Sequence, residues 1–117
     1  MEWLPESCPG LTVDIHSIAG VATAVCVKRH KELNIMFDVG QHVNLPGGVV
    51  SHVFISHGHL DHIGAMFSLA RMHGFGAKHP TFLVPEVCME PVMKAKEAFE
   101  VCLLLLIHHA YILRTYN

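Results

Sequence analysis

Alternation of apolar and polar positions in the first part of the chain predicts three β-strands. Residues 11–16, 21–27 and 33–37 are rich in Val, Ile and Thr and are separated by turn or charged residues, a composition typical of strands. The latter two are joined by a short charged tip, which predicts a hairpin. A further apolar run, Val53-Phe54-Ile55, predicts a short buried strand.

Helical spacing begins shortly after that fourth strand. The apolar residues that recur at this spacing are Ile63, Met66, Phe67 and Ala70. They predict a helix over residues 62–73. Gly74 suits the left-handed position just beyond a helix end, so we interpret the glycines that follow as a helix stop and not as a phosphate-binding loop.

The last third of the chain is predicted to hold a strand, two helical segments and an apolar tail. The strand covers residues 81–84. Pro91 lacks a backbone donor and interrupts a helix that runs through it, so we expect a short helical turn before it and a second helix from 91 to about 100. Residues 101–107 are apolar without amphipathic spacing, and they need burial or a partner surface.

Length and composition limit the chain to one domain with a modest core. It has 117 residues, of which 51% are hydrophobic and 15% are charged, and this balance excludes a disordered chain. The formal net charge is −2. No overall basic balance indicates nucleic-acid binding, so any RNA contact would have to be local. The charged tip at residues 28–32 is a weak candidate for such a contact.

Compartment signals are sparse. The four cysteines are Cys8, Cys26, Cys88 and Cys102, without a CxxC pair. No secretory signal precedes them, so reduced thiols are expected. No Lys or Arg occurs before Lys28, unlike in signal or transit peptides, and we expect a cytoplasmic or nuclear protein. The longest apolar run is too short to span a bilayer, so no membrane association is expected.

The most informative segment lies between the fourth strand and the helix after it. It reads Ser56-His57-Gly58-His59-Leu60-Asp61-His62. Imidazole nitrogens and carboxylate oxygens are usual ligands for Zn²⁺, and a catalytic zinc keeps an open position for water. The chain holds 11 His, yet the chance of this pattern is on the order of a few in a thousand. We therefore predict a metal site on a strand-to-helix turn.

The spacing of these residues suits two metals. His57 and His59 flank Gly58, so both can project to the same side and hold one metal. Asp61 and His62 open the helix and can reach a second metal, although Asp61 also suits the N-cap position. Two metals roughly 3.5 to 4 Å apart can share a hydroxide and stabilise the attacking and leaving oxygens. Such a site suits hydrolysis of phosphodiesters, thioesters or amides.

Alternative interpretations of the histidines stay open. A His-rich loop without metal is one, and a structural zinc is less favoured because such sites often use Cys, which is absent near the motif. His73 and His79 lack ligand companions at fixed spacing and are interpreted as surface or structural residues. The adjacent His108 and His109 could donate a further ligand, but we interpret them as incidental.

The segment from Ser56 to His62 resembles the metal-binding motif of the metallo-β-lactamase superfamily. Its flanks are similar to the short form of ribonuclease Z, the tRNA 3′ processing endonuclease. The similarity runs from about Ile15 to Glu100. The metal motif is specific for the superfamily. The strand end Phe37-Asp38-Val39-Gly40 and the continuation His62-Ile63-Gly64 favour the narrower family.

The resemblance implies an αβ/βα sandwich and a zinc-dependent phosphodiesterase that cuts precursor tRNA after the discriminator nucleotide. It implies that His57 and His59 bind one zinc and that Asp61 and His62 bind the other. Asp61 would also accept the proton of the nucleophilic water. Asp38 would support the ligand loop by hydrogen bonding, as groups that orient metal ligands do.

We expect residues 1–100 to form the N-terminal half of that fold, an α/β structure with a mixed sheet and helices on one face. Residues 101–117 are expected to be an apolar tail outside the family. The later His ligands and the bridging Asp of the family have no counterparts, which would fit a truncated, alternatively spliced or mispredicted product. We therefore expect the isolated chain to bind metal weakly and to cleave little, unless a second copy or another polypeptide completes the site.

Two further hypotheses stay open. One is another hydrolase of the superfamily, such as a glyoxalase II-like thioesterase or a lactamase-like enzyme, because the metal motif permits either. The other is an inactive half-domain, which is unstable or binds a partner through an uncovered apolar face.

Overall fold

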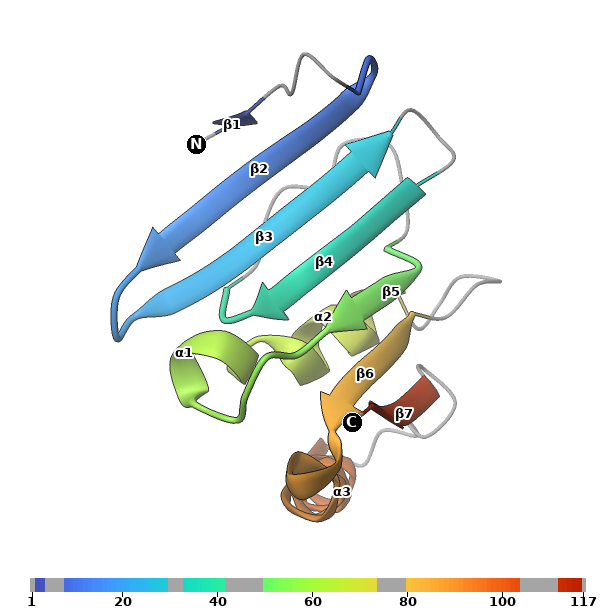
Figure 1. Cartoon of the computed structure of the whole chain (residues 1–117). Helices are drawn as coiled ribbons and strands as arrows, with labels where there is room; N and C mark the ends of the chain where they lie inside the picture. Colours follow the sequence, from blue (N-terminus) through green and yellow to red (C-terminus); the bar gives the residue numbers. More distant parts are fainter. Residues whose placement is uncertain are drawn as a thin grey trace.

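A single mixed sheet organises the part of the chain that the computed structural model describes, residues 2–3, 8–29, 33–41, 50–73, 80–103 and 112–116. Its strands are β1 (Glu2–Trp3), β2 (Leu11–Ile18), β3 (Ala22–Arg29), β4 (Leu33–Val39), β5 (His52–Phe54), β6 (Thr81–Pro85) and β7 (Ile112–Tyr116). The helices are α1 (Leu60–Ile63), α2 (Met66–His73) and α3 (Glu86–Leu103). The strands lie side by side in chain order (Figure 1).

The first four strands pair antiparallel, and the predicted strands are confirmed with longer bounds. The β2–β3 hairpin turns at Gly20, whose φ of +72° is a conformation that glycine adopts without steric cost. Between β3 and β4 the register shifts at Ala24 and Val25. Such an irregularity bends the strand, and here it lies next to the end of β4 that carries Asp38 and Val39.

The remaining strands pair in parallel, so their carboxyl ends meet at one edge of the sheet. Met36 pairs with Val53, and Val53 pairs with Phe82. The connection from β5 to β6 contains α1 and α2, and the connection from β6 to β7 contains α3 (Figure 1). The segment that carries the predicted metal ligands leaves the carboxyl end of β5, beside the end of β4.

The core lies between the helices and one face of the sheet. Buried strand residues on that face include Cys26, Met36, Val53 and Phe82, and they form one cluster with buried helix residues such as Met66. The predicted α/β class, with a mixed sheet and helices on one face, is confirmed.

The opposite face of the sheet carries apolar side chains that the described helices do not cover. Phe37 is 43% exposed and stacks on Phe54 with ring centroids 5.4 Å apart. Val25 pairs with Phe37 across the β3–β4 ladder, which extends the apolar row. Both faces of this sheet are therefore apolar, as in sheets buried on both sides.

The helix predicted over residues 62–73 is two helices, α1 and α2, separated at Gly64 and Ala65. The amide of Ala65 donates to the carbonyl of Val39 at 2.8 Å instead of continuing the helical ladder. The break therefore fixes the end of α1 to the end of β4. The predicted helix end at residue 73 is confirmed, whereas Gly74 and His79 lie outside the described residues.

The prediction that Pro91 divides the last helical region is wrong, because α3 runs through it. Proline removes the hydrogen bond to the carbonyl four residues earlier, which belongs to Val87. Val87 is 84% exposed, so water can bind that carbonyl. The residues around Val92 pack on the core, and this packing offsets the lost bond.

The segment from residue 101, expected to be a tail, contributes to the sheet. α3 extends to Leu103, and β7 pairs with β6 from Thr81 to Pro85. Residues 104–111, which include His108 and His109, lie outside the described residues, and the domain boundary at residue 100 stays a prediction. In the described ranges, no helix has both the length and the apolar content needed to cross a membrane.

Candidate metal centre

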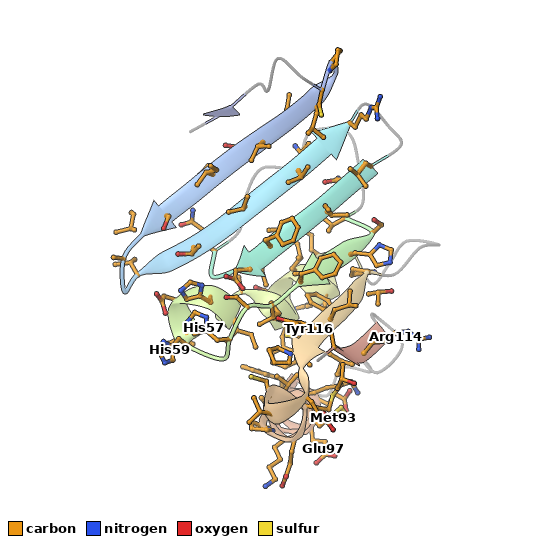
Figure 2. The ribbon with its side chains drawn as sticks, viewed as in Figure 1. His57, His59, Met93, Glu97, Arg114 and Tyr116 are labelled. Carbon is orange, nitrogen blue, oxygen red and sulfur yellow. The ribbon has the colours of Figure 1, made fainter. Side chains whose placement is uncertain are left out.

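The four predicted metal ligands come together at the sheet edge where β4 and β5 end. The rings of His57 and His62 have centroids 4.0 Å apart, and those of His57 and His59 are 4.6 Å apart. Nε2 of His62 lies 3.3 Å from Oδ2 of Asp61. Figure 2 shows His57 and His59 on the segment between β5 and α1. A run of six residues has thus folded into one cluster of three imidazoles and one carboxylate.

Asp61 is not the N-cap of α1, so this alternative role is wrong. The N-cap is His59, which makes no side-chain capping bond. Asp61 is the second residue of α1, and its carboxylate lies beside His62. Because the side chain is not used in capping, its oxygens are available for other chemistry.

Asp38 holds the loop by its carboxylate. The side chain accepts the Ser56 amide at 2.7 Å, the Ser56 hydroxyl at 2.6 Å, and a hydrogen bond from Nδ1 of His62 at 2.7 Å. Asp38 is 7% exposed and has a φ of +62°. Non-glycine residues take this conformation rarely, and it persists where surrounding contacts determine it. The predicted hydrogen-bonding support by Asp38 is therefore present.

The hydrogen bonds around Ser56 determine which imidazole nitrogens carry protons. The Ser56 hydroxyl donates its single proton to Asp38, so at its second contact, 2.8 Å from Nδ1 of His57, it must accept. His57 thus carries its proton on Nδ1. His62 also carries a proton on Nδ1, because a carboxylate can only accept. With the proton on Nδ1, the neutral form of each imidazole presents Nε2 as its free nitrogen, and the neutral form is the one that ligates metals.

Close backbone packing between β4 and α1 sets the position of the loop. A Cβ on Gly40 would lie 1.8 Å from the carbonyl oxygen of Asp61 and 2.7 Å from the amide nitrogen of Thr23. The Gly40 amide donates to the Thr23 carbonyl at 2.8 Å. Only glycine allows this approach, so Gly40 is required for the ligand loop to reach the sheet edge.

An apolar cavity of about 390 Å³ adjoins the other side of the loop, between α1–α2 and α3. Gly58, Leu60 and Phe67 line it from the loop side, and Cys88 and Phe99 line it from α3. Phe67 and Phe99 have ring centroids 5.1 Å apart. The cavity lacks the cationic side chains that would bind a phosphate, so it is an apolar flank of the loop.

One of the described thiols lies beside the ligand loop: Sγ of Cys88 is 3.4 Å from the position that a Cβ on Gly58 would take. Cys8, Cys26 and Cys88 are free cysteines. Burial raises the pKa of Cys26 from 9.0 to about 11, and the nearby charge of Lys28 lowers it by less. A thiol with a raised pKa is a poor nucleophile and a poor metal ligand.

The donor chemistry fits a zinc site in part. Three imidazoles and a carboxylate are usual zinc ligands, and the Nδ1 atoms of two imidazoles are tied to oxygen partners, as in known metal sites. Within the described ranges, however, no three His, Cys, Asp or Glu side chains converge as ligands of one ion. The residues fit the ligand type and its orientation but fall short of a complete coordination sphere.

The ligand candidates and Asp38 were predictable from the sequence, whereas the roles of Ser56 and Gly40 were not predicted. Ser56 directly precedes the first histidine, and its hydroxyl was a signal that the motif itself contained. Gly40 follows Asp38, and a glycine after a strand end signals a close backbone approach.

The family was tested by comparison with known proteins. A family model described as the metallo-beta-lactamase superfamily matches residues 20–101, well over half of the chain. No curated protein matches it. The matched residues include the ligand loop, Asp38, Gly40, α1, α2 and most of α3. The chain therefore belongs to the metallo-beta-lactamase superfamily, whose members are mainly metal-dependent hydrolases and typically bind zinc.

Proposed function

We propose that this chain supplies the ligand loop of a ribonuclease Z-type phosphodiesterase, which hydrolyses precursor tRNA at its 3′ end. The network from Asp38 through Ser56 to His57 and His62 carries the proposal, because it ties up both Nδ1 atoms and so assigns metal binding to the two Nε2 atoms at one sheet edge. The narrower family rests on the resemblance of the strand end that contains Asp38 and of the His62-Ile63-Gly64 continuation.

In this proposal His57 and His59 hold one zinc ion, and Asp61 and His62 hold a second. Bound zinc would supply a hydroxide at neutral pH and stabilise the oxygens of the phosphodiester. The Asp61 carboxylate accepts the proton of the attacking water. Its side chain is 18% exposed, so water can reach it, and it lies beside Nε2 of His62. Asp38 keeps the proton of His62 on Nδ1 throughout.

The site needs ligands beyond residues 57–62. A catalytic zinc usually has three protein ligands besides water, and two zinc ions would share only four here. We propose that a second copy of the chain or another polypeptide contributes the remainder, and that metal binding by the chain on its own is weak. Loosely held metals catalyse poorly, so cleavage by the isolated chain should be slow.

The substrate is proposed to be precursor tRNA. Lys28 and Arg29 lie at the end of β3, and they are the described part of the basic tip. A chain with a net charge of −2 gains little general attraction to RNA, so local contacts and a completing polypeptide would have to provide the affinity.

The proposal is tested by metal analysis after gel filtration, paired with hydrolysis assays on a precursor tRNA and on a thioester. We expect zinc below two equivalents and slow tRNA cleavage that leaves a 3′ hydroxyl. His59→Ala should lower the zinc content and abolish the cleavage. His52→Ala is the matched control, because His52 is an exposed histidine on β5 whose ring bonds to Ser51, outside the loop.

Three outcomes would contradict the proposal in different ways. Thioester turnover without tRNA cleavage would favour another hydrolase of the superfamily. Equal zinc content in the wild type and His59→Ala would remove the loop as a metal site. Rapid tRNA cleavage by the isolated monomer would refute the inference that the site needs completion.

A further inference from the structure

The carbonyl of Ile55 marks the point where the sheet ends and the ligand loop begins. In the parallel β5–β6 ladder, the Thr81 amide donates to the Ser51 carbonyl, and the Ile55 amide donates to the Leu83 carbonyl, both at 2.9 Å. This register advances by two residues per step. The next donor, opposite the Ile55 carbonyl, would be the amide of residue 85.

Residue 85 is proline and has no amide hydrogen. The Ile55 carbonyl would therefore lose its ladder donor at the entrance to the ligand loop. A carbonyl without a partner is costly when it is removed from water, and Ile55 is fully buried. Because residue 85 is proline, β6 supplies no backbone donor to the Ile55 carbonyl, which directly follows β5.

Tyr116 fills this position from β7. Its hydroxyl donates to the Ile55 carbonyl, and its backbone pairs with Pro85 in the β6–β7 ladder; Figure 2 labels its side chain. The residue that lacks the donor and the residue that replaces it are therefore direct register partners. Tyr116 lies outside residues 20–101, the range of the family match.

We propose that Tyr116 is a positioning residue for the ligand loop, acting through the Ile55 carbonyl. Two successive residues at the loop entrance are then held by different strands: Ile55 by Tyr116 of β7, and Ser56 by Asp38 of β4. Ser56 in turn accepts from His57. A shift of the Ile55 peptide would move Ser56 and displace the first imidazole.

This inference rests on the proposed function in so far as the loop binds metal, but its structural part can be measured without metal. In the Tyr116→Phe variant, which keeps the ring and removes the hydroxyl, we expect faster hydrogen exchange of the loop amides from Ser56 to Gly58. Loss of a group that bonds directly to a metal ligand typically weakens metal affinity about 10–100-fold. Tyr116 acts on the ligands only through the Ile55 peptide, so for Tyr116→Phe we expect Co²⁺ affinity to fall by about 3- to 10-fold.

A rescue variant separates positioning from general stability. Pro85→Ala restores an amide at the position that the ladder requires, so Tyr116→Phe/Pro85→Ala should recover slow loop exchange and Co²⁺ affinity. Thr115→Val is the control, because it removes an exposed hydroxyl from the same strand on the residue next to Tyr116.

Unchanged loop exchange in Tyr116→Phe would overturn the inference. Failure of Pro85→Ala to rescue the double variant would overturn the account of the missing ladder donor. If the wild type binds no Co²⁺, the proposed function fails, and the exchange data on the metal-free chain still decide the role of Tyr116.

Discussion

Replacing Asp38 with Asn separates the role of this residue in folding from its role in preparing metal ligands. Asp38 is 7% exposed, and its carboxylate makes three hydrogen bonds of 2.6–2.7 Å with Ser56 and His62. Asn has nearly the same shape, and it tolerates a positive φ as Asp does. The substitution thus changes the bonding capacity of one group and leaves the backbone free to keep its path.

The expected loss of stability is moderate. The Asn oxygen can still accept the Ser56 amide, while its NH₂ group faces the Ser56 hydroxyl and Nδ1 of His62. Hydrogen bonds to charged groups contribute about 1.5–3 kcal/mol each and neutral ones about 0.5–1.5 kcal/mol. Since all three bonds become neutral or rearrange, we expect the free energy of unfolding to fall by about 2–3 kcal/mol.

Asp38→Asn is also expected to weaken metal binding, because it changes which nitrogen of His62 carries the proton. An NH₂ group can only donate, so it favours the His62 tautomer with an unprotonated Nδ1 and the proton on Nε2. That proton occupies the nitrogen proposed to bind metal. Removing a carboxylate partner of a metal-bound histidine typically costs 10–100-fold in affinity, and we expect a loss of about that size here.

The assay combines urea denaturation, Co²⁺ titration against a chromophoric chelator, and ¹⁵N chemical shifts of the imidazoles in the metal-free chain. Asp14→Asn is the matched control, because Asp14 pairs with His16 at 3.1 Å on β2, away from the loop. It should leave metal affinity unchanged. A variant Asp38→Asn that shows the new His62 tautomer yet binds Co²⁺ as the wild type does would refute the assignment of His62 as a ligand.

Three further predictions concern Gly40, Ser56 and Cys26. Gly40→Ala should lower the free energy of unfolding by about 3 kcal/mol or more, since its Cβ would lie 1.8 Å from the Asp61 carbonyl oxygen; a loss below 1 kcal/mol in urea titration would contradict this. Ser56→Ala removes the acceptor for Nδ1–H of His57, so Co²⁺ affinity should fall by about 3- to 10-fold, and an unchanged value would argue against the proton assignment. Burial raises the pKa of the Cys26 thiol from 9.0 to about 11. The contribution of the buried thiol to the free energy of unfolding is therefore complete below pH 9 and is lost as the pH rises toward 11. Urea midpoints should fall over this pH range in the wild type, and Cys26→Ala should remove that fall.

The strands and the ligand candidates were predictable because each leaves a local signal. Alternating apolar side chains mark β2, β3 and β4, and the imidazoles and carboxylate of the loop occur within six consecutive residues. Hydrophobic periodicity also placed the helical region after the loop, since it depends on spacing within one element. What these signals share is that they require no knowledge of which elements meet.

The departures arise where a tertiary contact overrides a local preference. The break between α1 and α2 follows from the bond between Ala65 and the Val39 carbonyl, and Val39 is 26 positions away in the chain. Pro91 stays inside α3 because the helix packs on the core beyond it. The partner of Tyr116 lies 61 residues earlier in sequence, so no local pattern could indicate its hydrogen bond.

Contacts between protein groups hold the ligand loop in place, and this has a consequence for the energetics of metal binding. Asp38, Gly40 and Tyr116 hold the backbone and the imidazole protons through contacts that contain no ion. Where a site becomes ordered only on metal binding, part of the binding free energy is used for folding. A loop held by protein contacts needs little of that free energy for ordering. Weak metal binding by the isolated chain would therefore reflect the number of ligands and not the mobility of the loop. Added ligands from a completing polypeptide would then raise affinity without rearrangement of residues 57–62.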